Sequence, residues 1–145
     1  MIMKNPIKYF LLGVLFWVAV EWTTAFQPNI SRWISYMPAI WIFYIGSPLT
    51  FAFLIYKLKV SDRMLFICSV VLIFIVEILF TGNAMLYTFP IMLIALPASL
   101  LIYGMITFAP KWIAEGKIKD NRKKLAIMII AWVLISISTY INNAR

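Results

Sequence analysis

Five long apolar stretches, separated by short polar links, constrain this chain more than any other feature of its sequence. They lie at about residues 9–26, 37–56, 64–81, 84–109 and 125–141. A helix needs about 20 apolar residues to cross the ~30 Å hydrocarbon core of a bilayer. A helix also satisfies its own backbone hydrogen bonds, which lipid cannot do. The pattern predicts an all-α integral membrane protein, a bundle of five transmembrane helices that forms a single transmembrane domain over residues 1–145.

The composition excludes a soluble domain of this length. Hydrophobic residues make up 64% of the 145 residues and charged residues only 12%, whereas soluble chains are about 45–50% apolar and about 25% charged. A soluble domain of this size buries only about 70% of the surface that its unfolded chain exposes, which would leave much apolar surface in water. We therefore expect the lipid bilayer to be the solvent for most of this chain.

The basic residues are distributed unevenly among the links. If the five helices alternate in direction from a cytoplasmic N-terminus, eleven of the thirteen basic residues face the cytoplasm. These eleven are Lys4, Lys8, Lys57, Lys59, Arg63, Lys111, Lys117, Lys119, Arg122, Lys123 and Lys124. Only Arg32 and Arg145 lie outside, and basic residues in short loops favour the cytoplasmic side. The sequence therefore predicts a cytoplasmic N-terminus and an outside C-terminus, and the short loops favour a prokaryotic plasma membrane.

The net charge of +8 follows from this basic inner face, and it does not call for nucleic acid as a partner. We expect the face to attract anionic lipids, at about 1 kcal/mol for each basic residue near the membrane. The chain has no histidine and one cysteine, Cys68. These counts exclude Cys–His and Ser–His nucleophile pairs and leave few of the usual ligands for zinc or haem. We therefore expect no metal and no cofactor.

Two acidic residues lie inside the apolar stretches, Glu21 in the first and Glu77 in the third. Both stretches are expected to run outward. At 1.5 Å per residue, Glu77 lies roughly 6 Å and Glu21 roughly 7 Å below the outer end of its helix. Two separate helices thus place their single carboxylates at nearly the same depth, and intramembrane acids often mark ion pathways or substrate sites.

Other polar residues accompany the two glutamates at this depth. Thr24 and Thr81 each follow a glutamate by about one helical turn, on the same face. Asn83 and Tyr140 are expected near the outer ends of the fourth and fifth helices. Arg32, in the link after the first helix, is the expected cationic partner of either acid. The candidate substrate- or ion-binding residues are therefore Glu21, Glu77, Thr24, Thr81, Arg32, Asn83 and Tyr140.

Prolines inside two of the stretches predict irregular helices. Pro48 and Pro97 lie deep in the second and fourth stretches, where each removes a backbone hydrogen bond and is expected to kink its helix. Broken helices often line transporter sites. The fourth helix is expected to begin directly after Gly82 and Asn83, which would join it to the third helix as a tight hairpin. Seven-residue spacing then predicts one stripe on the fourth helix, formed by Asn83, Pro90, Pro97 and Gly104.

Three classes of function are compatible with these features. The first is a small homo-oligomeric transporter or ion-translocating unit, in which Glu21 and Glu77 face each other and bind a cation or exchange a proton. The second is an accessory or assembly subunit of a larger membrane complex, whose glutamates only extend to water and whose polar outer cap meets a partner membrane protein. The third is an enzyme acting on lipid, with the glutamates as acid and base. Because histidine and a sizeable outer loop are both lacking, the enzyme is disfavoured, and we rank the transporter first.

Overall fold

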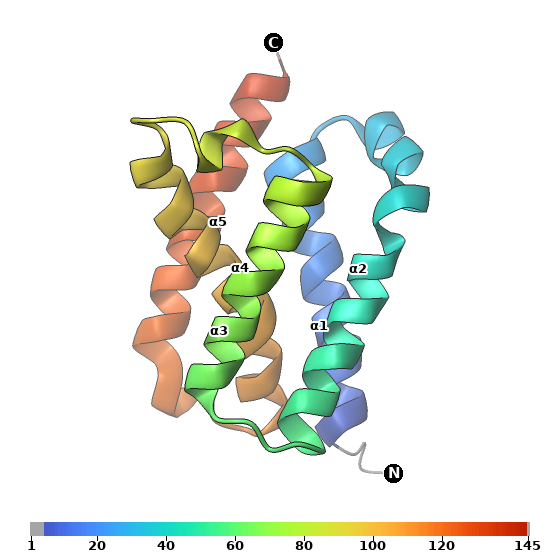
Figure 1. Cartoon of the computed structure of the whole chain (residues 1–145), viewed down its shortest axis with the longest axis vertical. Helices are drawn as coiled ribbons and strands as arrows, with labels where there is room; N and C mark the ends of the chain where they lie inside the picture. The colour runs from blue at the N-terminus through green and yellow to red at the C-terminus, as the bar shows by residue number, and fades with distance from the viewer. Residues whose placement is uncertain (1–4, 145) are drawn as a thin grey trace.

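The computed structural model describes residues 5–144, which form five long helices and no strand (Figure 1). Helix α1 spans Asn5–Glu21 and continues as a π-helical segment, Trp22–Phe26. Helix α2 spans Ile30–Tyr56. Helix α3 spans Asp62–Ile73 and continues as a second π-helical segment, Phe74–Phe80. The last two long helices are α4, Met92–Ala114, and α5, Arg122–Asn143.

Each of the five helices, with its continuation, is long and apolar enough to cross a membrane. Their lengths run from 19 to 27 residues, close to the ~20 that the hydrocarbon core requires. The prediction of an all-helical chain with five long helices is therefore confirmed over residues 5–144.

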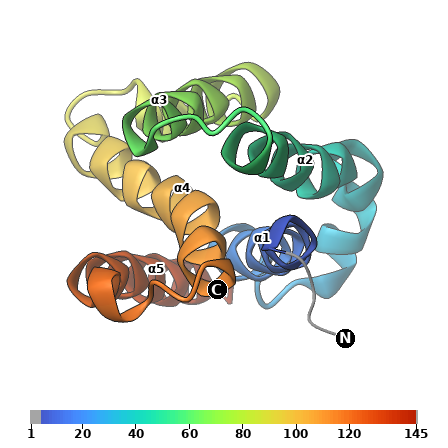
Figure 2. The same cartoon turned by 90° about the horizontal axis from the view of Figure 1, so that it is seen from below.

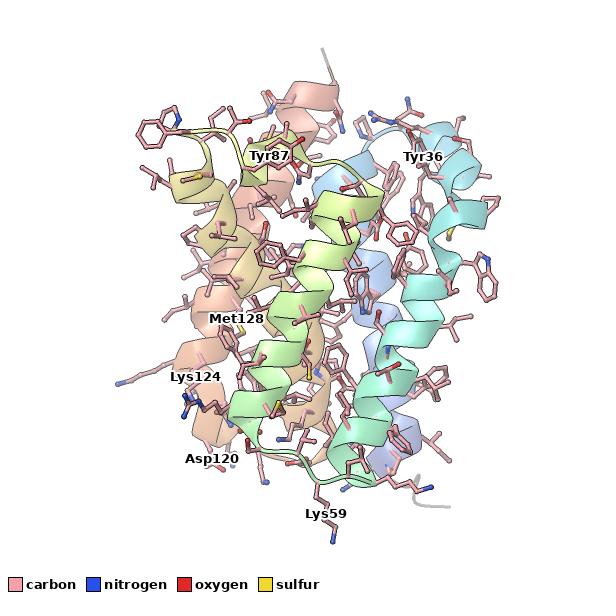
Figure 3. The ribbon with its side chains drawn as sticks, in the orientation of Figure 1. Tyr36, Lys59, Tyr87, Asp120, Lys124 and Met128 are labelled. Atoms are coloured by element: carbon pink, nitrogen blue, oxygen red, sulfur yellow. The ribbon has the colours of Figure 1, made fainter. Side chains whose placement is uncertain are left out.

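The helices alternate in direction, so the two ends of the described chain lie at opposite ends of the bundle (Figure 1). We call the end with the links 57–61 and 115–121 the lower end, and the end with the links 27–29 and 81–91 the upper end. Figure 3 places Lys59, Asp120 and Lys124 at the lower end and Tyr36 and Tyr87 at the upper end. Lys4 and Arg145, which belong to the predicted charge distribution, lie outside the described residues.

Helices α1 and α4 hold the bundle together. Helix α1 packs against α2 and α4, and α4 packs in addition against α3 and α5. Figure 2, seen from below, shows α3 and α5 on opposite sides of α4. The upper end of α5 also packs against the π-helical segment Trp22–Phe26. No described residue of α5 is buried, so this helix is the outermost of the five.

Helix α2 begins at Ile30, seven residues before the predicted start. The side chain of Asn29 accepts a hydrogen bond from the backbone N–H of Arg32 at 2.9 Å, which satisfies one of the free donors of the first turn. Arg32 therefore lies in the first turn of α2, and the prediction that it lies in a link is wrong. Because this first turn contains polar residues, hydropathy alone placed the start of the helix too late in the chain.

The connection between α3 and α4 is longer than predicted. Helix α4 begins at Met92 rather than at residue 84, after a short 3₁₀ turn, Ala84–Leu86. Asn83 accepts a hydrogen bond from the backbone N–H of Met85 at 3.2 Å, and the residue before Pro90 is biased against the helical conformation. The predicted tight hairpin is therefore wrong. Asn83 and Pro90 precede α4, so they do not share a helical stripe with Pro97 and Gly104.

The two prolines that were predicted to kink their helices both lie inside helices, Pro48 in α2 and Pro97 in α4. Pro48 is fully buried and lies against Gly13 of α1. A Cβ atom built on Gly13 would lie 2.8 Å from the Cβ atom of Pro48, closer than such atoms approach one another. Glycine at position 13 thus allows α1 and α2 to pack closely, as small residues do in membrane helix pairs.

Candidate functional site

The carboxylate of Glu77 is bound by side chains from two other parts of the chain. The hydroxyl of Tyr103, on α4, donates a hydrogen bond to Oε1 at 2.9 Å. The side-chain amide of Asn83, in the link 81–91, donates to Oε2 at 2.9 Å. Each carboxylate oxygen therefore accepts one hydrogen bond from a neutral donor, and Glu77 is fixed in place.

The local chain path brings Asn83 to Glu77. The backbone carbonyl of Glu77 accepts hydrogen bonds from the hydroxyl of Thr81 and from the backbone N–H of Asn83, both at 2.7 Å. The chain after α3 thus folds back over the last turn of the π-helical segment. Tyr103 reaches the same carboxylate from below, because helical side chains lean toward the N-terminus of their helix, which in α4 is the upper end.

Aromatic residues form the floor of this site. Tyr103, only 5% exposed, meets the ring of Trp17 edge-on, with 5.6 Å between the ring centroids. Trp17 also lies 6.4 Å from the ring of Tyr44 on α2. The hydroxyl of Tyr44 accepts a hydrogen bond from the indole N–H of Trp33 at 3.1 Å. Three helices, α1, α2 and α4, therefore contribute to one aromatic cluster.

Glu21 is the last residue of α1 and lies one turn above Trp17 on the same face. It is half-buried. Its carboxylate lies within electrostatic range of Glu77 and Tyr44, and among residues 5–144 no side-chain hydrogen bond reaches it. The structure therefore brings the two predicted glutamates into one region, where Glu77 is hydrogen-bonded and Glu21 is not. We name Glu21, Glu77, Asn83, Tyr103, Trp17 and Tyr44 the upper site.

Both glutamates lie where a helix widens. Glu21 directly precedes the π-helical segment Trp22–Phe26, and Glu77 lies within the segment Phe74–Phe80. π-helical turns are rare and occur frequently at functional sites. Next to Glu21, the hydroxyls of Thr23 and Thr24 donate to backbone carbonyls three or four residues earlier, a contact that bends helices.

Thr24 and Tyr140 lie on a different side of α1 from Glu77. The backbone carbonyl of Thr24 accepts a hydrogen bond from Thr139 on α5 at 2.8 Å. Tyr140 is exposed and lines a groove of about 390 Å³ between α5 and the π-helical segment of α1. These two predicted site residues therefore belong to the contact between α1 and α5 rather than to the upper site.

Arg32 lies over the rings of Phe26 and Tyr36, with 6.0 Å between its guanidinium and each ring centroid. The ion pairs within the described residues are Lys111 with Asp62 and Lys117 with Glu115, both at the lower end. The expected ion pair between Arg32 and a glutamate is therefore not formed. At the lower end, the hydrogen bond that Lys117 donates to the carboxylate of Glu115 raises the pKa of this exposed lysine.

Sequence reasoning missed Tyr103, Trp17 and Tyr44 because each lies within an apolar stretch, where an aromatic residue looks like ordinary core. For Trp17 a signal existed, since it precedes Glu21 by four residues and so shares its helical face. For Tyr103 there was none, because its partner lies 26 residues away in the chain.

The upper site can bind a proton or a small cation, because two carboxylates share it and no basic side chain is paired with either in the part of the chain that the structure describes. Within the same residues, no group of three or more His, Cys, Asp or Glu side chains is placed to hold a metal ion.

No protein-family model, curated protein or solved structure matches this chain.

Proposed function

We propose that this chain is an integral membrane protein with its lower end in the cytoplasm, in a prokaryotic plasma membrane. The support is the distribution of basic residues over the bundle. Every basic residue of residues 5–144 except Arg32 lies at the lower end, in a first or last helical turn or in the links 57–61 and 115–121. Basic residues near helix ends favour the cytoplasmic side, and they also attract anionic lipid headgroups there.

Within that membrane, the proposed function is ion translocation by a small homo-oligomeric transporter. The observation that carries this proposal is the environment of Glu77, whose half-buried side chain is held at the upper end of an apolar bundle by Tyr103 and Asn83 and lies near a second acid, Glu21. Acidic residues within membrane helices are costly, and they mark ion or substrate pathways when they face the bundle interior. Five helices give a thin wall around a pathway, so the proposal includes assembly of several copies.

Ion flux across vesicles tests this function. The purified full-length protein is reconstituted into liposomes, and the fluxes of protons, Na⁺ and K⁺ are measured under imposed gradients. We expect a flux that is lost in Glu77→Gln, because the amide is nearly the size of the carboxylate but carries no charge. Glu115→Gln at the lower end is the matched control and should retain the flux. Vesicles that show no protein-dependent flux of any ion would contradict the proposal.

An accessory subunit of a larger membrane complex is the second candidate. The observation in its favour is α5, which buries none of its described residues and exposes Ile130, Leu134 and Ile137, among others. Lipid covers such a surface as well as a partner helix does. Native mass spectrometry of the protein from its own membrane separates the candidates, since copies of this chain alone support the transporter and a different membrane protein supports the subunit.

A further inference from the structure

The two carboxylates of the upper site differ in their hydrogen bonds, and this difference points to the ion that the site takes. We propose that the ion is the proton and that Glu21 carries it, while Glu77 is a fixed anion that positions Tyr103 and Asn83. This inference rests on the proposed function and names the substrate of the same site.

A proton on Glu77 would weaken the contacts that hold its side chain. Tyr103 donates to one of its oxygens and Asn83 to the other, each at 2.9 Å. The amide N–H and the phenol O–H are donors, and hydrogen bonds to an ionised acceptor are stronger than those to a neutral one, so a proton on either oxygen would weaken these hydrogen bonds. The same two bonds join α3 to α4 and to the link 81–91, so breaking one also loosens the fold.

Glu21 has the opposite surroundings. It is half-buried and accepts no side-chain hydrogen bond within residues 5–144. The indole N–H of Trp17, one turn below, is buried without an acceptor in that same part of the chain. Tyr44 accepts from Trp33 and donates to none of the described residues. A buried donor without an acceptor, Trp17, and a half-buried acceptor without a donor, Glu21, therefore lie one turn apart on the same face of α1, and a buried polar group such as the Trp17 indole needs a partner.

The donors Trp17 and Tyr44 suit Glu21 in its deprotonated state, from which it can then take up a proton. As a carboxylate, Glu21 can accept hydrogen bonds through a water molecule to which Trp17 and Tyr44 have donors to offer. On protonation, the carboxylate oxygen forms an O–H bond with the incoming proton, and one negative charge near Glu77 disappears. The repulsion between the two acids is relieved at that moment, so uptake and release of the proton change the interaction between α1 and α3.

The same groups disfavour a metal cation. Hard cations such as Ca²⁺ take six to eight oxygen ligands, and Mg²⁺ requires near-octahedral oxygen coordination. Near Glu21, Trp17 offers an N–H donor rather than an oxygen ligand, the hydroxyl of Tyr44 already accepts from Trp33, and each oxygen of Glu77 already accepts one hydrogen bond. A proton requires only one acceptor, which Glu21 supplies.

The other titratable or charged groups around Glu21 come from each element that packs against this end of α1. They are Glu77 from the segment Phe74–Phe80, Tyr44 from α2 and Tyr103 from α4, whereas Tyr140 on α5 lines the groove on the other side of α1. The hydrogen bonds from α5 to this end come from neutral groups, Trp132, Thr139 and Asn143. Glu21 is therefore the only acid in this set whose carboxylate is free of hydrogen-bonded donors.

Two measurements on the reconstituted full-length protein test the inference. The first compares proton flux with Na⁺ and K⁺ flux for the wild type, Glu21→Gln, Glu77→Gln and Trp17→Phe, with Glu115→Gln as control. The second follows the carboxylic-acid C=O band by infrared difference spectroscopy between acidic and alkaline pH. We expect proton flux only, and a protonation band that is lost in Glu21→Gln and kept in Glu77→Gln. Trp17→Phe should retain the ring packing but shift the pH midpoint of the band.

The outcomes separate this inference from the proposed function. Na⁺ or K⁺ flux that depends on Glu77 would leave ion translocation standing and overturn the proton as the ion. A protonation band that survives Glu21→Gln but disappears in Glu77→Gln would overturn the assignment of the carrier. A band lost in Glu21→Gln without flux of any ion would support the proton site and refute transport.

Discussion

At the scale of single residues, the contact that matters most is the hydrogen bond between Tyr103 and Glu77. Tyr103 is almost fully buried, so its hydroxyl has little access to water when its partner is lost. Hydrogen bonds to charged groups contribute more than those between neutral groups. The phenol therefore both stabilises the bundle and orients the carboxylate, and these two effects can be measured together.

We predict that Tyr103→Phe lowers the free energy of unfolding by about 1–3 kcal/mol, because Glu77 loses one of its two donors. Thermal unfolding in detergent measures the change. The matched control is Tyr87→Phe, since Tyr87 is exposed and its hydroxyl makes only a 3.4 Å contact with the carbonyl of Gly82. Equal destabilisation by both variants would contradict the role assigned to Tyr103.

At the scale of helices, the close approach of α1 and α2 depends on the missing side chain at position 13. Pro48 occupies the space that a Cβ atom at Gly13 would need. This contact lies below the upper site, so the separation of the two helices influences where Trp17 and Tyr44 meet. Gly46, also on α2, has no atom within 4 Å of the corresponding Cβ position, so the chain offers an internal control.

We predict opposite effects for alanine at these two glycines. Gly13→Ala should destabilise the protein by about 1–3 kcal/mol, because overpacking forces the helices apart. Gly46→Ala should be neutral or stabilise it by about 0.5–1 kcal/mol, because alanine loses less backbone entropy in a helix. Unfolding of both variants in the same detergent gives the comparison, and a stable Gly13→Ala protein would show that α1 and α2 do not pack as described.

At the scale of the whole molecule, the alternation of the helices separates the two ends of the bundle by charge. The lower end carries the basic residues of α1, α3, α4 and α5, whereas the upper end carries Arg32 and the two glutamates. Figure 3 places Lys59 and Tyr87 at opposite ends. The orientation of the protein in the membrane therefore decides which of these two residues faces the cytoplasm.

We predict that single cysteines at these two positions are labelled from opposite sides. In a Cys68→Ala background, Lys59→Cys should react with a membrane-impermeant thiol reagent only when the cytoplasmic side is exposed, because the lower end is basic. Tyr87→Cys should react from outside in intact cells. Labelling of both from one side would contradict five alternating membrane crossings, and the reverse pattern would contradict a cytoplasmic N-terminus.

The sequence by itself determined the number and type of the long helices, because hydropathy and length act through the local chain alone. It also predicted which end is basic and that Glu21 and Glu77 lie at one level, since both follow from counting residues along alternating helices. The start of α2 was missed because its first turn is polar, and the start of α4 because a short turn at Asn83 interrupts an apolar run.

Only the tertiary structure decided which side chains surround the glutamates. Tyr103 reaches Glu77 across 26 residues of chain, and Trp17, Tyr44 and Tyr103 meet because three helices present particular faces to one another. Periodicity cannot choose among the faces of a helix that is apolar on all sides. The widening of both helices at the glutamates also depends on packing, and for that reason the difference between a bound Glu77 and a free Glu21 emerged only from the folded chain.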